Sequence, residues 1–345
     1  MKNSSSRKSH LDFLRVICIL GVIYIHVIGY QSGNIFTNHV YIGHIIDFLT
    51  SASVPLFFMI SGALLLDRTE DIQNVFSKRI LRFSIVLISI SVIQWLIAYS
   101  FDESISIKSV FFGIIGAKSI PHVNFWALWF LYVYIIVLIF LPFLQHLAKA
   151  LPNSAYIYLI ILHFIIACCI PSIHNIAGNG NSDIFLYKIT PFYKAESFPC
   201  TPIYASFYLL LGYYSEHRLR YSKKPIVILA VLSSIILVSY PILKQFSYSY
   251  EFVSIPCIFI YATTKYLWKK WNIQNEKLWL TLGGAAFSVM LTENIFRLFA
   301  QPHIEKLIPC DNKFLSLSIV VILTWITCLT IGVALKRIPI VNRFI

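Results

Sequence analysis

Residues 11–30, LDFLRVICILGVIYIHVIGY, decide the fold of this chain. The run is apolar and long enough to cross a bilayer as one helix. It nevertheless contains Asp12, Arg15 and His26. An Arg or Asp at the centre of a membrane helix costs roughly 2.5–3.5 kcal/mol on insertion scales. The sequence therefore predicts a first membrane span whose ionisable residues carry function. Its length and its Arg and His favour a retained span over a cleaved signal peptide.

The spacing of these residues places them on one side of the helix. Arg15 and His26 are eleven positions apart, which at about 100° per residue is three turns plus roughly 20°. They share a helix face and lie about 16 Å apart along the axis, at ~1.5 Å rise per residue. Asp12 precedes Arg15 by three positions and is placed to orient it.

The composition indicates an all-α polytopic membrane protein. Of the 345 residues, 58% are hydrophobic and only 12% are charged, whereas soluble proteins carry about 25% charged residues. We predict a single integral membrane domain over residues 1–345. We expect about ten transmembrane helices, at about 11–31, 42–66, 80–99, 125–147, 154–173, 201–217, 225–243, 249–267, 279–300 and 314–335.

The positive charge follows the predicted topology. The net charge is +13, and Lys and Arg accumulate in cytoplasmic loops. With the N-terminus inside, 20 of the 28 Lys and Arg residues fall on the cytoplasmic side. An even number of spans returns the C-terminus to the cytoplasm. The charge is thus explained by topology, and we expect no nucleic-acid partner.

The cysteines suggest at most one covalent link. Cys200 and Cys310 both fall in loops predicted to face outward, where an oxidising compartment would permit a disulfide between them. The sequence leaves that pairing open. It contains no CxxC pair and no Cys/His ligand spacing, so we predict no metal site.

The first span offers a cation near one membrane surface and an imidazole deep inside. His26 is either a buried hydrogen-bonded side chain or a general base, since His suits proton transfer near neutral pH. Arg15 either extends to the lipid headgroups or holds an anion such as phosphate. A phosphate clamp below a base suits a ligand with a charged head and a long thin reactive arm. Coenzyme A has that shape.

Two further segments carry candidate residues. Arg79 and Arg82 lie one helical turn apart after the second span. They are either charges that set topology or ligands for the nucleotide phosphates of coenzyme A. Within the second span, residues 53–62 read SVPLFFMISG. Pro55 removes a backbone donor and can kink this helix, while Ser61-Gly62 permits close helix approach.

The opening of the chain resembles the acyltransferase-3 family of membrane O-acyltransferases. The resemblance rests on Arg15-x10-His26, preceded by Leu-Asp-x-Leu at 11–14, and on the SVPLFFMISG run at 53–62. It implies transfer of an acyl group, usually acetyl, from cytoplasmic acyl-CoA to a sugar hydroxyl on the outer side of the membrane. Members of the family decorate O-antigen, exopolysaccharide or enterobacterial common antigen, which implies a bacterial inner membrane location.

Other parts of the chain match the family's pattern more weakly. Arg79-x2-Arg82 matches its cytoplasmic arginine pair, Leu-Trp-Phe-Leu at 128–131 resembles part of its fourth-span motif, and Leu-Gly at 282–283 with Phe287 resembles its ninth-span region. With these pieces the resemblance runs over nearly the whole chain.

The sequence departs from the family at two places. Ala127 stands where a His often precedes Leu-Trp-Phe-Leu, and Glu293 stands where the ninth-span motif often ends in His. Glu293 lies one turn from Arg297, so it either forms a buried ion pair or hydrogen-bonds sugar hydroxyls. Glu293, Trp129 and Ser61 are our candidate acceptor-site residues.

We therefore predict an O-acetyltransferase that uses acetyl-CoA as donor and a polysaccharide or polyprenyl-linked oligosaccharide as acceptor. Arg15, Arg79 and Arg82 would hold the donor phosphates, with Asp12 orienting Arg15. His26 would act as a base or carry the acetyl group itself, and the sequence does not decide between these roles. The alternatives are a transporter or flippase for a polyprenyl-linked glycan, and an acyltransferase that uses another donor such as succinyl-CoA. The oligomeric state is open.

Overall fold

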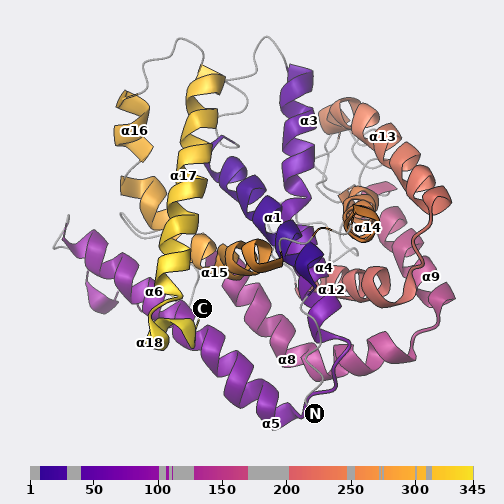
Figure 1. The fold of residues 1–345 in the computed structure, drawn as a ribbon, viewed down its shortest axis with the longest axis horizontal. Helices are drawn as coiled ribbons and strands as arrows, with labels where there is room; N and C mark the ends of the chain where they lie inside the picture. The colour runs from indigo at the N-terminus through magenta and orange to yellow at the C-terminus, as the bar shows by residue number, and fades with distance from the viewer. Residues whose placement is uncertain are drawn as a thin grey trace, which may run out of the picture.

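The computed structural model describes eleven stretches of the chain, and within them every regular element is a helix (Figure 1). The described residues are 8–28, 40–100, 106–108, 111, 128–169, 202–246, 253–271, 273, 276–299, 301–307 and 313–344. No strand occurs in these ranges. The predicted all-α class is therefore confirmed for this part of the chain.

The helices follow the apolar runs of the sequence. In chain order they are α1 Ser9–Val27, α3 Val40–Ser51, α4 Ser53–Leu65, α5 Ile72–Asn74, η2 Val75–Ile80, α6 Leu81–Tyr99, α8 Trp129–Ala150, α9 Asn153–His163, η4 Phe164–Cys169, α12 Pro202–Tyr213, η6 Tyr214–Arg218, α13 Lys223–Phe246, α14 Ser254–Trp271, α15 Glu276–Phe299, α16 Gln301–Leu307, α17 Lys313–Leu335 and α18 Pro339–Asn342.

Among the described residues, five helical segments are long and apolar enough to cross a membrane. They are Ser9–Val27, Ile45–Leu65, Ile72–Ile97, Trp129–Ala150 and Lys313–Leu335. The protein is thus a multi-pass membrane protein. The other five predicted spans coincide with α9 and η4, with α12 and η6, and with α13, α14 and α15, but these helices do not meet that criterion. The ten-span topology remains a prediction.

The second predicted span is interrupted at Ala52, between α3 and α4. The cause is Pro55, which has no N–H to donate to the carbonyl three to four residues earlier. At the end of α3, the hydroxyls of Thr50 and Ser51 donate to the backbone carbonyls of Ile46 and Asp47 one turn back, at 2.9 Å and 2.6 Å. The helix resumes when the Leu56 N–H donates to the Ala52 carbonyl at 3.0 Å.

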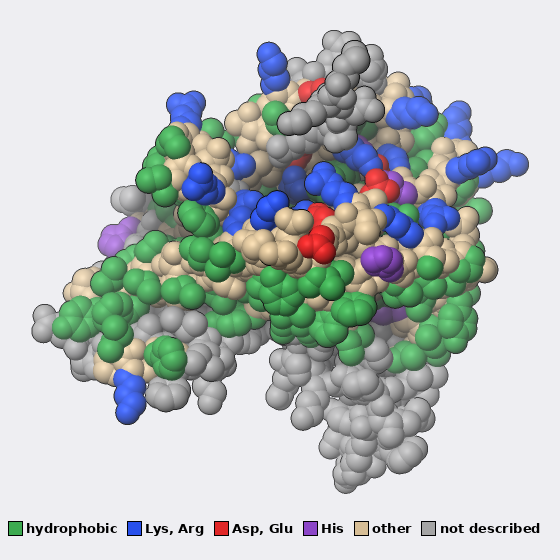
Figure 2. Space-filling view, turned by 90° about the horizontal axis from the view of Figure 1, so that it is seen from below, with side chains coloured by type: hydrophobic (Ala, Val, Ile, Leu, Met, Phe, Trp, Pro, Cys, Tyr) green, Lys and Arg blue, Asp and Glu red, His purple; other side chains and the backbone are tan. Residues whose placement is uncertain are grey.

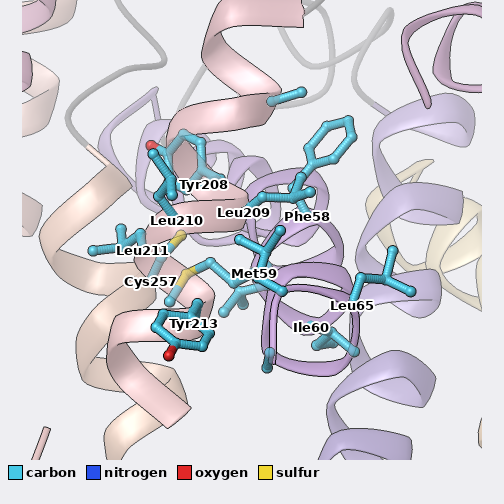
Figure 3. Close-up of a cluster of buried hydrophobic side chains, with 14 of the residues drawn as sticks. Phe58, Met59, Ile60, Leu65, Tyr208, Leu209, Leu210, Leu211, Tyr213 and Cys257 are labelled. Atoms are coloured by element: carbon cyan, nitrogen blue, oxygen red, sulfur yellow. The ribbon is translucent and has the colours of Figure 1, made fainter. Parts of the chain in front are cut away.

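The core centres on the crossing of α4 and α12, where two glycines let the backbones touch (Figure 3). A Cβ on Gly62 would lie 1.9 Å from the Leu209 carbonyl oxygen, and a Cβ on Gly212 would lie 1.9 Å from that of Met59. Met59 and Leu209 are fully buried. The close approach that Ser61-Gly62 predicts is present at Gly62.

Helix α1 lies in the middle of the fold, against α15 (Figure 1). Gly283 allows the contact, because a Cβ there would lie 2.5 Å from the Cβ of Asp12. Further along both helices, His26 hydrogen-bonds Glu293 at 3.0 Å. The pairs Asp12–Gly283 and His26–Glu293 show that α1 and α15 run in the same direction.

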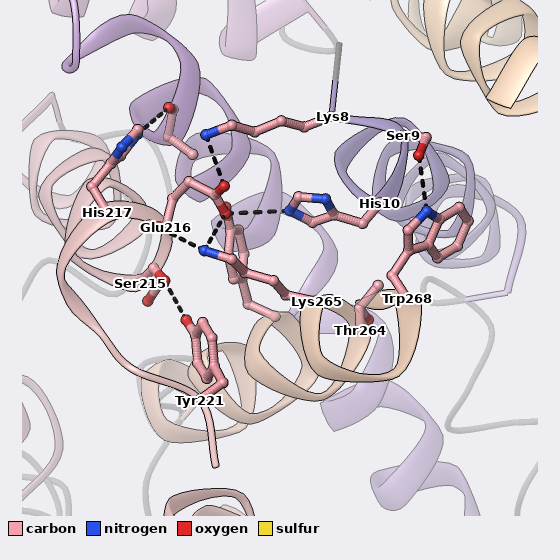
Figure 4. Close-up of polar contacts among 12 residues, drawn as sticks. Lys8, Ser9, His10, Ser215, Glu216, His217, Tyr221, Thr264, Lys265 and Trp268 are labelled. Atoms are coloured by element: carbon pink, nitrogen blue, oxygen red, sulfur yellow. Dashed lines mark hydrogen bonds and ion pairs between the residues drawn. The ribbon is translucent and has the colours of Figure 1, made fainter. Parts of the chain in front are cut away.

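Lys and Arg side chains gather on one face of the molecule, beside a band of hydrophobic side chains (Figure 2). Glu216 of η6, whose side chain is 3% exposed, joins three segments of the chain. Its carboxylate pairs with Lys8 at 2.8 Å, His10 at 3.2 Å and Lys265 at 3.1 Å (Figure 4), and accepts a hydrogen bond from the Tyr261 hydroxyl at 2.9 Å. The N-terminal arm, η6 and α14 thus meet here.

Further contacts join other connecting segments of the chain. Arg218 of η6 donates to the Lys149 carbonyl at 3.1 Å, and the Lys149 ammonium donates to Thr69 at 2.6 Å. These are segments that the positive-inside count puts on one side of the membrane. Their contacts agree with a common side. That this side is the cytoplasm remains a prediction.

Candidate active site

The candidate residues fall into two groups at different levels of α1 and α15. The first group surrounds a cavity of about 250 Å³. Side chains from α1, α4, α6, α8 and α15, and one residue that follows α17, line this cavity. They are Arg15, Phe57, Ser61, Arg82, Phe83, Phe130, Tyr134, Gly283, Gly284, Ala286, Phe287, Met290 and Lys336.

Arg15 is held in this cavity by Asp12. Its Nη1 donates to the Asp12 carboxylate at 2.6 Å, and Asp12 itself is only 1% exposed. Asp12 is fixed in turn by Gly283, whose missing side chain leaves room for the Asp12 backbone. Because the Asp12 carboxylate is buried and its backbone packs against Gly283, the Arg15 guanidinium that it binds has a defined position.

The two arginines after the second span have different surroundings. Arg82 lines the cavity, and its Nε donates to the Phe344 carbonyl at 2.8 Å. Arg79 instead forms a two-pronged pair with both carboxylate oxygens of Glu70. The hydrogen bonds from Arg79 hold the pKa of Glu70 below its ordinary value. Arg79 is not among the described residues that line the cavity. Its two hydrogen bonds to Glu70 indicate a structural ion pair.

Of the two other candidate acceptor residues, Ser61 lies in the cavity of the donor arginines and Trp129 is not among the residues that line it. Ser61 lines the same cavity as Arg15 and Arg82. Trp129, at the start of α8, packs with its edge toward Phe130, which lines the cavity, at a ring separation of 6.1 Å. Ser61 therefore belongs to the first group, and Trp129 lies next to it in sequence and space through Phe130.

The second group is centred on His26 and Glu293. The Nδ1 of His26 lies 3.0 Å from Oε2 of Glu293, and Glu293 is 2% exposed. A carboxylate only accepts hydrogen bonds, so this contact favours the tautomer of His26 with the proton on Nδ1, in which Nε2 is the ring nitrogen that can accept a proton. The arrangement presents a histidine whose orientation and tautomer are fixed by a buried carboxylate.

The far side of Glu293 faces Arg297. The Nε of Arg297 lies 3.4 Å from Glu293 Oε1, and its Nη2 donates to Asn294 Oδ1 at 3.1 Å. Glu293 Oε1 and Asn294 Nδ2 are buried and have no hydrogen-bond partner among the described residues. Buried polar atoms normally have partners. Among the described residues, the Arg297 guanidinium is the group that compensates Glu293 Oε1, through the ion pair at 3.4 Å.

The two groups are connected along α15. The cavity lining on this helix includes Gly283, Ala286, Phe287 and Met290, which are spaced as one face of an α-helix, and Gly284 next to them. Glu293 follows Met290 by three residues and continues that face. Among the described residues, the cavity lining itself does not reach His26.

Sequence reasoning missed two residues of this site. They are Lys336, which follows the tenth predicted span, and Asn294, which follows Glu293; no sequence pattern distinguishes either of them. The Cys200–Cys310 pairing and the departure at Ala127 lie outside the described residues. Within the described ranges, no group of three or more His, Cys, Asp or Glu side chains forms a ligand set for a metal ion.

Comparisons with known proteins identify the family. The acyltransferase domain of the acyltransferase-3 family matches residues 9–341, nearly the whole chain. No curated protein and no solved structure matches the chain. The matched region contains both the cavity around Arg15 and the pair of His26 with Glu293. The chain therefore belongs to the acyltransferase-3 family and is a membrane acyltransferase.

Proposed function

We propose that this protein transfers an acetyl group from cytoplasmic acetyl-CoA to a hydroxyl of a cell-surface or lipid-linked glycan in the bacterial inner membrane. One observation carries the proposal: the same two helices hold a cationic cavity at Arg15 and, eleven residues further along α1, a histidine oriented by a buried carboxylate. A charged donor with a long arm fits that separation of about 16 Å, at ~1.5 Å per residue.

The cationic cavity would bind the phosphates of the donor. Guanidinium groups match phosphate oxygens with two parallel hydrogen bonds, and Arg15 and Arg82 both line the cavity. Arg79 would support the site from outside through Glu70. Aromatic side chains, among them Phe130 and Tyr134, supply apolar walls for the less polar part of the donor.

His26 would perform the chemistry with its Nε2 atom. As a base, Nε2 takes the proton of the acceptor hydroxyl while the hydroxyl oxygen attacks the thioester carbonyl; the C–O bond forms, the C–S bond breaks, and the thiolate leaves and recovers the proton. As a nucleophile, Nε2 first takes the acetyl group and passes it to the hydroxyl in a second step. Glu293 would stabilise the positive charge that His26 gains in either route. We thus assign Glu293 to positioning His26, in place of a direct contact with sugar.

The experiment that tests the proposal uses the purified protein in lipid nanodiscs with labelled acetyl-CoA. The wild-type protein should release or transfer label, and His26→Ala should abolish this activity. Arg15→Ala should raise KM for acetyl-CoA. The control His146→Ala changes a histidine that, among the described residues, hydrogen-bonds within its own helix, to the Pro142 carbonyl at 2.8 Å, and should be active. No turnover by the wild-type protein would favour a transporter, and competition by succinyl-CoA would reveal a longer acyl donor.

A further inference from the structure

Arg297 is a charged residue near His26 to which the proposed chemistry gives no role. Its side chain is 22% exposed, whereas that of Glu293 is 3% exposed. The Nε of Arg297 lies 3.4 Å from Glu293 Oε1, and the other carboxylate oxygen, Oε2, lies 3.0 Å from His26 Nδ1. The two oxygens of one buried carboxylate are therefore divided between an arginine and the candidate catalytic histidine.

The guanidinium of Arg297 is itself held by the local structure of α15. Arg297 follows Glu293 by four residues and Asn294 by three, so both lie one helical turn back. Its Nη2 donates to Asn294 Oδ1 at 3.1 Å, and Asn294 is 2% exposed. Arg297 also lies in the last turn of α15, where the helix dipole favours a cation. These effects together keep the guanidinium against the carboxylate.

Packing fixes the backbones that carry His26 and Glu293, but it does not fix the direction of the carboxylate. Ile23 and Val27 of α1 belong to the same buried cluster as Val289 of α15, so the two helices are held at one level. The Glu293 carboxylate is separated from its backbone by three rotatable bonds, and its direction depends on its own partners. A buried carboxylate without a cation is also costly, and the ion pair with Arg297 offsets that cost.

We propose that Arg297 is a positioning residue that holds the Glu293 carboxylate with Oε2 toward His26 Nδ1. This inference rests on the proposed function, in which Glu293 positions His26, and it extends that chain of contacts by one residue. Arg297 touches no reacting atom in this arrangement. Its contribution to the reaction therefore passes through Glu293, and a second substitution at Glu293 should remove it.

The test is a double-mutant cycle in nanodiscs, with labelled acetyl-CoA as donor and release of labelled acetate to water as readout. Arg297→Gln should lower kcat about tenfold and leave KM for acetyl-CoA within about twofold, because the donor cavity is unchanged. Arg297→Lys keeps the positive charge and should recover part of kcat. In a protein that already carries Glu293→Gln, adding Arg297→Gln should change kcat by less than about twofold. Arg337→Gln makes the same chemical change at an exposed position and should behave as the wild type.

Thermal unfolding separates this role from a purely structural one. Arg297→Gln leaves a buried carboxylate without its cation and should lower Tm, whereas the double variant removes both charges and should recover part of that loss. If Arg297→Gln does not fold, the comparison of the double variant with Glu293→Gln still decides the question.

Each other result contradicts a definite part of the proposal. A wild-type kcat in folded Arg297→Gln, or a further fall of kcat in the double variant, would overturn the positioning role and leave the proposed function intact. A rise in KM for acetyl-CoA with an unchanged kcat would overturn it as well, because Arg297 would then act on the donor. No turnover by the wild-type protein would refute the proposed function and, with it, this inference.

Discussion

Replacing Glu293 by Gln tests how the site activates its histidine. Gln is nearly isosteric with Glu and its Oε1 can still accept the hydrogen bond from His26 Nδ1, which in the native protein is 3.0 Å long. The change therefore keeps the geometry and removes the negative charge. If His26 becomes positively charged during the reaction, the transition state loses stabilisation and the ground state does not.

The structure sets the size of the effect. Two unit charges about 3 Å apart interact by roughly 5 kcal/mol at an effective dielectric constant of about 20. The amide dipole of Gln recovers part of this interaction energy. Arg297, whose Nε lies 3.4 Å from Glu293, already offsets part of the carboxylate charge in the native protein. We expect a loss of about 3 kcal/mol, which lowers kcat on the order of a hundredfold, with a small change in KM for acetyl-CoA.

The assay is steady-state acetyl transfer by purified Glu293→Gln in nanodiscs, with thermal unfolding measured in parallel. Glu276→Gln is the matched control, because it makes the same chemical change at an exposed position in the first turn of the same helix. The control should keep kcat within about twofold. A folded Glu293→Gln protein with the kcat of the wild type would refute the positioning role of this carboxylate.

Three other predictions concern stability. Gly62→Ala would place a methyl group 1.9 Å from the Leu209 carbonyl oxygen. It should therefore cost at least the ~1–3 kcal/mol of stability typical of overpacking and lower Tm in detergent. An unchanged Tm would contradict the close contact of α4 with α12 at Gly62. Glu216→Gln should also lower Tm, because Glu216 is buried among two lysines and a histidine and breaking such a cluster costs about 3–5 kcal/mol when it is fully buried; a stable variant would show that the cluster is not structural. The hydrogen bond from Arg79 lowers the folded-state pKa of Glu70 below 4.5, so the stabilisation is present above pH 4.5 and is lost as pH falls through the folded-state pKa. The Tm difference between wild type and Glu70→Gln should therefore vanish in acid, and a difference that persists there would contradict this account.

Much of the helical framework could be predicted from local sequence. Apolar runs give the helices, and Pro55 gives the break at Ala52, because both depend on hydrophobicity and on a missing backbone donor. The same-face relation of Arg15 and His26 follows from helix geometry alone. The contact between Asp12 and Arg15 follows from a spacing of three residues.

Tertiary packing decided the parts of the site that the sequence left open. Arg79 and Arg82 look equivalent in the sequence, one turn apart. Their roles differ because Glu70 pairs with the first and the Phe344 carbonyl, 262 residues further along the chain, accepts from the second. Glu293 meets His26 across 267 positions, through the close packing of α1 on α15 at Gly283. No local pattern reports that contact, and the same holds for Lys336.

The most direct test of the central claim is mass spectrometry of surface glycan from cells that lack this protein and are complemented with the wild type or with His26→Ala. The account predicts that the wild-type protein restores a mass increment of one acetyl group and that His26→Ala, present in the membrane at the same level, does not. An acetylated glycan in the His26→Ala cells would contradict it.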